Sequence, residues 1–464
     1  MNTFLFFDDF MIDNIQSFRK RHFKAKKQST FYLNKITGGH STVKVGEKYY
    51  LLYTTINDYA NDWNRVPFYA ISDDGINYTP IGPMTGMNIP GSFYINKDTH
   101  TNNPKELYKT VIMKIDSNDE HNSKGYVATS GDFLNWNTNT DYKISNHASD
   151  STNNIFYNNV LKKYQIIFRG AYIDRRISTI FSDDLKTWSE PMLILSPTPF
   201  DEPLTQYYGM AVYPFNGIFL GALQIYHTDP NDFLSTKMIG KTDAALVYSY
   251  NGINWSRVSN EYMIERPLYP EYGSGGIYPM NMVESKNKAE WIIGAGSPIN
   301  DHGCGFKPAY PDWDFPKASE KTGNTAVCFY KIRKFGFTGL ESYGYKSYIR
   351  FKKIQLLSDN LTFNAISSFG YIKFQMKDEN YKIIEGFSFE DCIPFTGDSV
   401  SFSPQFKNKK IAELINKSIH IEIECRTTIL FAMEGDFRPH HGVQPQESLG
   451  FPQPLKMNEE RKIK

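Results

Sequence analysis

The sequence predicts an all-β protein: a five-bladed β-propeller followed by a C-terminal β-sandwich. The first observation is a seven-residue pattern, in which a serine and a turn of Asp, Asn or Gly residues precede an aromatic residue. It occurs four times, at residues 72–78, 130–136, 182–188 and 249–255. The second observation is a change after Gly336, where runs of alternating polar and apolar residues begin. Tandem units of this spacing are typical of propeller blades, and such alternation is typical of sandwich strands.

Each copy of the pattern is interpreted as a hairpin. In the first copy the apolar run 66–71 precedes Ser72, and residues 73–75 form the turn, because Asp and Gly adopt the conformations that tight turns require. Tyr78 then opens the next strand and packs across the hairpin. Two further strand-like runs, 41–45 and 48–53, precede this hairpin. Four strands per unit predict one blade.

A fifth unit lacks the serine pattern. We expect its strands at residues 276–283, 290–294 and 325–330, and we expect the apolar segment 4–7 to close the ring or to pack on the second domain. The alternative is an array of ordinary β-sandwiches. The expected regions are an N-terminal strand and basic segment packing on the propeller (1–29), the propeller (30–335), the sandwich (336–436) and an extended or disordered tail (437–464).

Composition excludes several classes of protein. The net charge of +1 does not favour nucleic acid as a partner, and no apolar run is long enough to span a membrane. The N-terminus lacks the pattern of a signal peptide, so a cytoplasmic location is expected, or a secreted or periplasmic one if a leader was trimmed. The basic run 19–27 is interpreted as a solvated surface, with an anion-binding patch as the alternative. The four cysteines lack metal-type spacing, and we predict no metal and no cofactor.

The serine–turn–aromatic repeats resemble the blade turns of glycoside hydrolase families 32, 43 and 68, and also the Asp-box of sialidases. A propeller followed by a sandwich is similar to family 32, and closest to a poorly characterised family-32-like group of bacterial proteins. The resemblance implies a hydrolase of O-glycosyl bonds in oligo- or polysaccharides, and thus a role in carbohydrate metabolism. The segments that carry it are 5–9, 149–154, 169–170, 175–176, 387–392 and 397–399.

The sequence departs from family 32 at the motifs of its catalytic triad. The nucleophile motif Trp-x-Asn-Asp-Pro-x-Gly has no carboxylate counterpart in residues 37–42, and the Arg-Asp-Pro triplet is absent. The Glu-Cys motif occurs only as Glu424-Cys425, in the expected sandwich. Neither that triad nor fructosidase activity is carried over to this chain.

Propeller topology predicts where a site would lie. Loops that join the second strand to the third, or one blade to the next, lie opposite the serine turns and open on the central funnel. Several of them are long here, for example 197–208 and 226–242, and long loops are often functional. The acids on these loops are Asp58, Asp62, Asp150, Asp201, Glu202, Asp243, Glu271 and Asp301.

Cleavage of a glycosidic bond needs one carboxyl group that donates a proton and another that attacks carbon or activates water. We predict Asp150 as the nucleophile or base, and Glu271 or Asp243 as the acid. The structural interpretations stay open: Asp150 as a turn cap, Asp243 paired with Arg176 between blades, and Glu271 as a surface charge. The hypothesis requires two carboxyl groups within about 10 Å of each other in the funnel.

Predicted sugar contacts lie on the same loops and strand ends. An arginine near the acids would keep one of them ionised or would recognise an acidic sugar. The alternatives to a glycosidase are a transglycosidase, a catalytically silent glycan-binding propeller and a protein-interaction propeller; the sequence does not indicate an oligomeric state. The predicted substrate-binding residues are His40, His147, Arg169, Arg176, Tyr226, His227, Tyr278 and His302.

Overall fold

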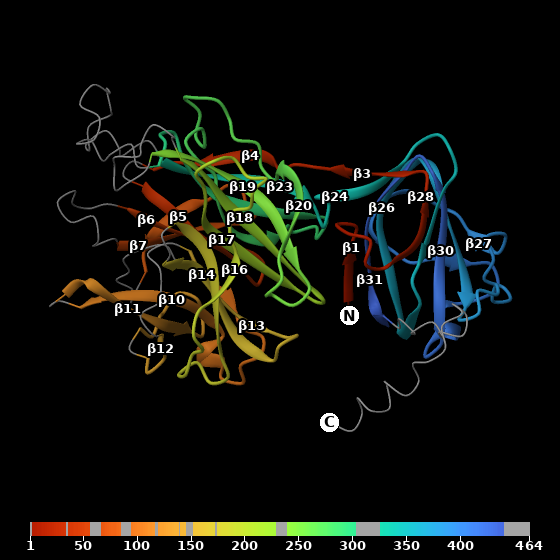
Figure 1. The fold of residues 1–464 in the computed structure, drawn as a ribbon, viewed down its shortest axis with the longest axis horizontal. Helices are drawn as coiled ribbons and strands as arrows, with labels where there is room; N and C mark the ends of the chain where they lie inside the picture. The colour runs from red at the N-terminus through yellow and green to blue at the C-terminus, as the bar shows by residue number, and fades with distance from the viewer. Residues whose placement is uncertain are drawn as a thin grey trace. The chain divides into compact units, whose positions relative to one another are not determined.

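The computed structural model describes residues 2–33, 36–55, 66–84, 94–116, 119–138, 140–144, 152–171, 174–228, 239–302 and 325–439. Within these ranges nearly all regular structure is β-strand (Figure 1). None of the described residues forms a helix long and apolar enough to cross a membrane. The chain divides into two compact units, His22–Thr338 and the combination of Met1–Arg21 with Gly339–Lys464.

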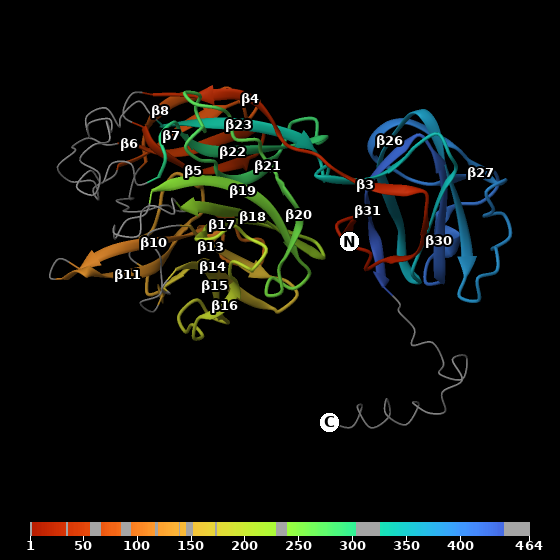
Figure 2. The same ribbon diagram turned by 45° about the horizontal axis from the view of Figure 1, so that its top comes forward.

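The His22–Thr338 unit consists of five four-stranded sheets, the blades of a propeller (Figure 2). In each sheet, neighbouring strands pair antiparallel. This confirms the predicted five-bladed propeller. Blade 1 contains β5 (Ile36–Val45), β6 (Lys48–Thr55), β7 (Val66–Ser72) and β8 (Thr79–Pro83). Blade 2 contains β9 (Asn96–Lys97), β10 (Tyr108–Asp116), β11 (Asp119–Ser130) and β12 (Lys143–Ile144).

The remaining blades follow the same order from the inner to the outer strand. Blade 3 contains β13 (Asn153–Asn158), β14 (Lys163–Ala171), β15 (Arg175–Ser182) and β16 (Met192–Leu195). Blade 4 contains β17 (Thr205–Phe215), β18 (Ile218–Thr228), β19 (Gly240–Ser249) and β20 (Ser256–Tyr262). Blade 5 contains β21 (Tyr278–Glu284), β22 (Glu290–Pro298), β23 (Thr325–Arg333) and β4 (Lys26–Phe31).

The ring closes through β4, an N-terminal strand that forms the outer edge of blade 5 and pairs with β23. Because no hairpin joins these two strands, blade 5 has no place for the serine turn. Of the two alternatives for residues 4–7, the structure shows packing on the second domain, whereas the expected packing of the whole segment 1–29 on the propeller is not observed. β1 (Asn2–Leu5) pairs with β31 (Thr428–Pro439) of the other unit, and the boundary expected at residue 30 falls inside β4.

The serine turns connect the third and fourth strands of blades 1 to 4, as predicted. In blade 3, Ser182 Oγ accepts hydrogen bonds from the backbone N–H groups of Asp184 and Leu185 at 3.2 and 2.8 Å. The third residue after the serine has a positive φ in all four copies: 76° at Gly75, 73° at Phe133, 65° at Leu185 and 77° at Gly252. Phe133 and Leu185 are buried, and burial of a large apolar side chain, about 1.5–3 kcal/mol, offsets the backbone strain.

Buried polar side chains link the inner strands of neighbouring blades around the axis. Asn281 of β21 accepts a hydrogen bond from Ser41 of β5 and donates one to the carbonyl of Ile95, next to β9, at 2.9 Å. Asn154 of β13 donates to the Met210 carbonyl of β17 at 2.6 Å. These bonds connect blades that do not share a sheet.

Replacing Asn281 by alanine is expected to lower the free energy of unfolding by about 2–3 kcal/mol, because buried partners lose their hydrogen bonds. Urea unfolding followed by tryptophan fluorescence measures this for the propeller alone, since all six tryptophans lie between positions 63 and 313. The control is Asn287→Ala: Asn287 is exposed in the β21–β22 turn. Equal losses in both variants would contradict the axial role of Asn281.

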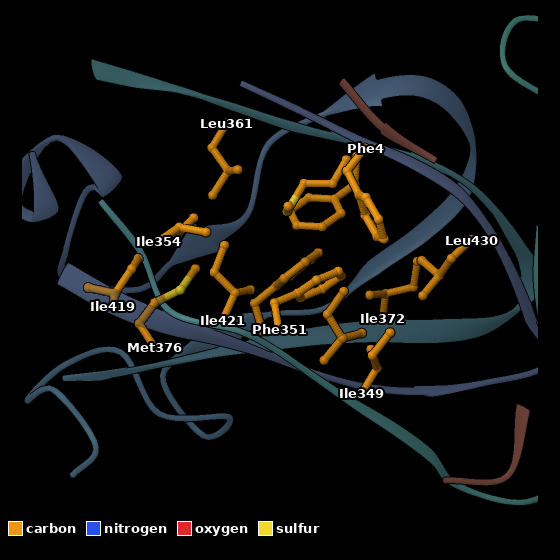
Figure 3. Packing of buried hydrophobic residues seen from close by; sticks show 14 of the residues in the cluster. Phe4, Ile349, Phe351, Ile354, Leu361, Ile372, Met376, Ile419, Ile421 and Leu430 are labelled. Atoms are coloured by element: carbon orange, nitrogen blue, oxygen red, sulfur yellow. The ribbon is translucent and has the colours of Figure 1, made fainter. Parts of the chain in front are cut away.

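The second unit is a nine-stranded sheet that curves around its own core, and it confirms the predicted sandwich. Its longest strand is β26 (Ile354–Asp378), which pairs with both β31 and β30 (Ser418–Arg426). Phe4 of β1 packs in the core with Phe351 and Leu430 (Figure 3). The other strands are β2 (Ile12–Gln16), β3 (Phe18–His22), β24 (Thr338–Ser342), β25 (Ser347–Phe351) and β28 (Phe395–Phe402), beside a two-stranded sheet of β27 (Cys392–Ile393) and β29 (Gln405–Phe406).

Side chains of the basic run 19–27 pair with carboxylates. Arg19 and Arg21 both contact Glu341, at 2.8 and 2.7 Å, and Lys24 pairs with Glu265. The arginine and lysine side chains of these pairs are 36–59% exposed. The contacts favour the interpretation of this run as a solvated, ion-paired surface.

Candidate functional site

A hollow of about 470 Å³ lies on the propeller face opposite the serine turns. It is formed by the β18–β19 strand ends of blade 4 and by the loops that lead into blades 4 and 5. Its lining includes three carboxylates, Glu202, Asp243 and Asp301, together with His227, Tyr262 and Arg266. Three of the acids noted in the sequence therefore lie together in one hollow.

Asp243, near the start of β19, is almost completely buried, with 4% of its side chain exposed. Its Oδ1 accepts a hydrogen bond from Arg266 Nε at 2.9 Å, and its Oδ2 lies 3.3 Å from His227 Nε2. Burial alone would raise the pKa of Asp243, but these two partners outweigh it and hold the pKa below its ordinary value. Asp243 is therefore ionised at neutral pH. A carboxylate has about four acceptor positions, so it can still receive a ligand hydroxyl.

His227 lies between two carboxylates. Its Nε2 faces Asp243, and its Nδ1 lies 3.3 Å from Glu202 Oε2 without hydrogen-bond geometry. Because imidazole nitrogens are about 2 Å apart, the facing oxygens of Asp243 and Glu202 are at most about 9 Å apart. Carboxyl pairs of glycosidases are separated by roughly 5–9.5 Å. Asp243 and Glu202 are thus two carboxyl groups within about 10 Å of each other, with the His227 ring between them.

An aromatic cluster adjoins the hollow. At its centre is Tyr208 of β17, at a point where the register with β18 shifts; such a bulge re-aims a side chain. The Tyr208 ring centroid lies 4.9 Å from that of His302, 5.7 Å from that of Tyr226 and 5.9 Å from that of Tyr278. These residues come from blades 4 and 5.

Two arginines of blade 3 complete the cluster. The guanidinium carbons of Arg169 and Arg175 lie 5.1 and 5.5 Å from the Tyr208 ring centroid. Cations at this distance from an aromatic ring are attracted by its π-face. Side chains of three blades therefore meet around Tyr208.

The backbone joins the cluster to the hollow. Gly240, which lines the hollow, exchanges two hydrogen bonds with His302, of 3.1 and 2.9 Å. A Cβ at Gly240 would lie 2.0 Å from the His227 carbonyl oxygen, so this close approach requires glycine. On the cluster side, Thr242 donates a hydrogen bond to Tyr278 Oη at 3.0 Å, and burial raises the pKa of Tyr278. These contacts link the hollow to the cluster, in which Tyr208 and Tyr278 are partly exposed and Tyr226 is completely buried; we call the hollow and the cluster together the blade 4 site.

The structure brings together six of the residues predicted from sequence. Asp243 and His227 lie in the hollow, and Arg169, Tyr226, Tyr278 and His302 lie in the aromatic cluster. Asp150 and His147, like Asp58 and Asp62, lie outside the described residues. His40 belongs to β5, but its side chain is outside the described part.

Glu271 and Arg176 do not join this site. Glu271 is exposed in the β20–β21 loop and is absent from the lining of the hollow, which favours its interpretation as a surface charge. Arg176 pairs with Asp174 through two hydrogen bonds. The expected pair of Arg176 with Asp243 is therefore not formed: Arg176 pairs with Asp174, and Asp243 pairs with Arg266.

Strand alternation explains why Arg176 and Asp243 do not meet. Asp243 pairs in register with Ile225, which belongs to the core between blades 3 and 4. Arg176 shares a strand face with Ile180, which belongs to the core between blades 2 and 3. Each side chain points to the blade that precedes its own: Arg176 points to blade 2 and Asp243 to blade 3. The two side chains are therefore separated by blade 3.

Sequence reasoning missed several members of the site. Arg175 could have been found from the alternation rule, because it occupies the opposite strand face from Arg176. Glu202 and Asp301 were recognised as loop acids without a role. Nothing local marks the others, whose positions depend on a bulge or on partners far along the chain; they are Tyr208, Tyr262 and Arg266.

No three His, Cys, Asp or Glu residues in the described ranges are arranged to hold a metal ion. The carboxylates Asp243 and Glu202 instead face arginine and histidine nitrogens. Carboxylate oxygens accept hydrogen bonds, so they suit the hydroxyl groups of a polar ligand.

No protein-family model matches the sequence, and no curated protein matches it. Among solved structures, a thermostable family-43 glycoside hydrolase has a TM-score of 0.46 and 13% identity, over 68% of this chain and 95% of that one. A xylan β-1,4-xylosidase from Bacillus halodurans C-125 has a TM-score of 0.42 and 10% identity, over 88% of this chain and 100% of that one. A GH32 β-fructofuranosidase from Bombyx mori has a TM-score of 0.38 and 9% identity, over 90% of this chain and 94% of that one. The chain is similar in fold to these proteins.

Proposed function

We propose that the chain is a glycoside hydrolase that cleaves a glycosidic bond of an oligo- or polysaccharide in the blade 4 site. The observation that supports this function is the pair of carboxylates, Asp243 and Glu202, whose facing oxygens lie within about 9 Å of each other at a hollow. The adjoining Tyr208 and Tyr278 are partly exposed, and a tyrosine supplies an apolar face with a polar tip. Pockets for small polar ligands combine such surfaces with a few fixed polar groups.

In this proposal Asp243 acts as the base or nucleophile. Its ion pair with Arg266 keeps it ionised, whereas the acid of a glycosidase has to be protonated. This reverses the acid role that sequence reasoning assigned to Asp243. The upper limit of about 9 Å on the carboxylate separation is compatible with the retaining geometry, about 5 Å, and with the inverting geometry, roughly 6.5–9.5 Å.

Glu202 is the proposed proton donor. Its side chain lines the hollow and is 79% exposed, so it is accessible to the leaving oxygen of a sugar bound there. Asp150, predicted from sequence, stays a second candidate for the base.

One observation favours a different function, a glycan-binding propeller without catalysis. Both oxygens of Asp243 already have protein partners, Arg266 and His227. In a binding protein Asp243 would serve only to orient these two side chains toward a ligand.

A product screen by mass spectrometry separates the two functions. Wild type, Asp150→Asn and Glu202→Gln would be incubated with a broad panel of oligosaccharides and bacterial surface polysaccharides. Sugar release by wild type that is lost in Glu202→Gln supports the hydrolase and the proposed donor. Release that is lost only in Asp150→Asn keeps the enzyme class and moves the chemistry to Asp150. Glycan binding without release by wild type would establish the binding protein.

A further inference from the structure

We infer that Arg175 binds an anionic group, a carboxylate or a sulfate, on the glycan that occupies the blade 4 site. The inference rests on the proposed function only in taking the ligand to be a glycan; it does not require cleavage. It adds a substrate class, acidic sugars, and names the side chain that selects it.

The first support is the unusual surroundings of the Arg175 charge. Its guanidinium carbon lies 5.5 Å from the Tyr208 ring centroid and 5.3 Å from that of Tyr226. Its Nη1 donates a hydrogen bond of 2.8 Å to the neutral amide oxygen of Gln206. No described carboxylate forms an ion pair with it, and a guanidinium has five N–H donors in total.

Nearby arginines of blades 3 and 4 differ in this respect. Arg176 pairs with Asp174, Arg257 with Asp201 and Arg266 with Asp243. Each of these arginines is neutralised by a carboxylate of the chain itself. Arg175 has an amide where they have an acid, so its positive charge is left for a ligand.

The second support is the position of Arg175 in the site. It pairs in register with Ala171, and Arg169 pairs with Ile177, so strand alternation places both arginines on one face of blade 3. Ile177 belongs to the core shared with blade 4, and this face is therefore directed to Tyr208. Arg169 also contacts the Tyr208 ring, at 5.1 Å. An anion next to Arg175 would thus lie beside the aromatic cluster that borders the hollow.

The chemistry suits an oxyanion. The planar guanidinium presents parallel N–H groups that match two oxygens of a carboxylate or sulfate. The Tyr208 and Tyr226 rings hold the guanidinium and keep water from its faces, which strengthens an ion pair. The anionic sugar unit would then lie against Tyr208, next to the sugar unit whose glycosidic bond faces Asp243.

Binding measurements on a glycan array, followed by calorimetry on the bound glycans, test the inference. The array would carry uronic, sialic and sulfated glycans together with their neutral counterparts. We expect wild type to bind acidic glycans at least ten times more tightly than their neutral counterparts, and to lose affinity with added salt. Arg175→Gln should weaken this binding about 10- to 100-fold, whereas Arg175→Lys, which keeps the charge, should weaken it less.

The matched control is Arg176→Gln, which removes a neighbouring arginine from the opposite face of the same strand. It should change affinity for acidic glycans by less than about threefold, as expected for a paired surface arginine. Comparing the affinity for uronic or sialic glycans with the affinity for sulfated glycans shows whether the bound anion is a carboxylate or a sulfate. The inference would be overturned if neutral glycans bound as tightly as acidic ones, or if no acidic glycan bound. It would also be overturned if Arg175→Gln and Arg176→Gln lost the same affinity for acidic glycans. Acidic glycans bound but never cleaved would uphold Arg175 and refute the hydrolase.

Discussion

Replacing Asp243 by asparagine is expected to lower the rate of glycan cleavage about 10³-fold, the middle of the range for loss of a general base. The substitution keeps the shape of the side chain but removes the negative charge that Arg266 and His227 stabilise. The rate would be measured on the glycan that wild type cleaves, with tryptophan fluorescence to verify that the propeller is folded. Retention of more than about a tenth of the wild-type rate would remove Asp243 from the reaction.

Asp201 provides the matched control for this experiment. It lies in the loop that leads into blade 4, has a nearly buried side chain, 5% exposed, and pairs with Arg257 at 2.7 Å. It does not line the hollow; its Oδ2 accepts hydrogen bonds from the Thr198 backbone N–H and the Tyr207 hydroxyl. Asp201→Asn should therefore change stability while the cleavage rate of the folded protein stays within a few-fold of wild type.

The pH dependence of the rate follows from the same ion pair. The pKa of Asp243 lies below its ordinary value, which is about 3.9 for an aspartate. Activity that needs the ionised form is therefore present above that value and is lost only as the pH falls through the lowered pKa. A rate that already declined between pH 6 and 5 because of Asp243 would contradict this assignment.

Replacing Lys109 by methionine is expected to destabilise the propeller by about 3–5 kcal/mol, the cost of leaving a buried charge without its partner. Lys109 Nζ lies 2.7 Å from Asp98 Oδ2, and the two side chains are only 2% and 4% exposed. Asp98 also accepts a hydrogen bond of 2.9 Å from the Tyr164 hydroxyl of blade 3. The carboxylate thus joins blades 2 and 3, and urea unfolding followed by tryptophan fluorescence would measure the loss.

Lys163→Met is the control, because it removes an ion pair of the same length in a different environment. Lys163 Nζ lies 2.7 Å from Asp183 Oδ2, but these side chains are 43% and 73% exposed. Exposed pairs contribute about 0–1 kcal/mol. Similar losses in the two methionine variants would show that burial does not decide the value of the Lys109 pair.

Acid should weaken the buried pair in a defined direction. Burial by itself raises the pKa of Asp98, but the hydrogen bond and charge of Lys109 outweigh it, so the pKa is lowered overall. The stability that this carboxylate contributes is present above its unfolded pKa, about 3.9, and is lost as the pH falls through the lower folded value. The stability difference between wild type and Lys109→Met should therefore be greatest near neutral pH and shrink in acid.

Local interactions explain why the blades could be predicted. The serine turn is held by hydrogen bonds between residues two and three positions apart, such as those of Ser182 with Asp184 and Leu185. Because these contacts are local, four copies of the pattern in tandem predict four similar hairpins. The alternation after Gly336 predicts sandwich strands for the same reason, because each strand face follows from neighbouring positions.

Distant contacts explain why much of the site could not be predicted. The partner of Asp243 is Arg266, which is 23 positions away in a loop without a recognisable motif. Tyr208 faces the cluster because of a register shift in β17, and a shift of one residue reverses the face of every side chain. Asp243 was predicted at the start of a strand, whereas β19 begins three residues earlier, at Gly240, and the ionised state of Asp243 depends on Arg266 and His227.

The sequence by itself determined that this protein repeats a four-stranded unit, that a sandwich follows, and that acids gather on the loops opposite the serine turns. Those properties depend on turn chemistry and on periodicity, which act over a few residues. Only the tertiary structure decided that β4 closes the ring, that Arg175 rather than Arg176 contacts Tyr208, and that His227 lies between Asp243 and Glu202. These contacts join residues from different blades or distant strands, and they form only when the packing of the whole ring brings those residues together.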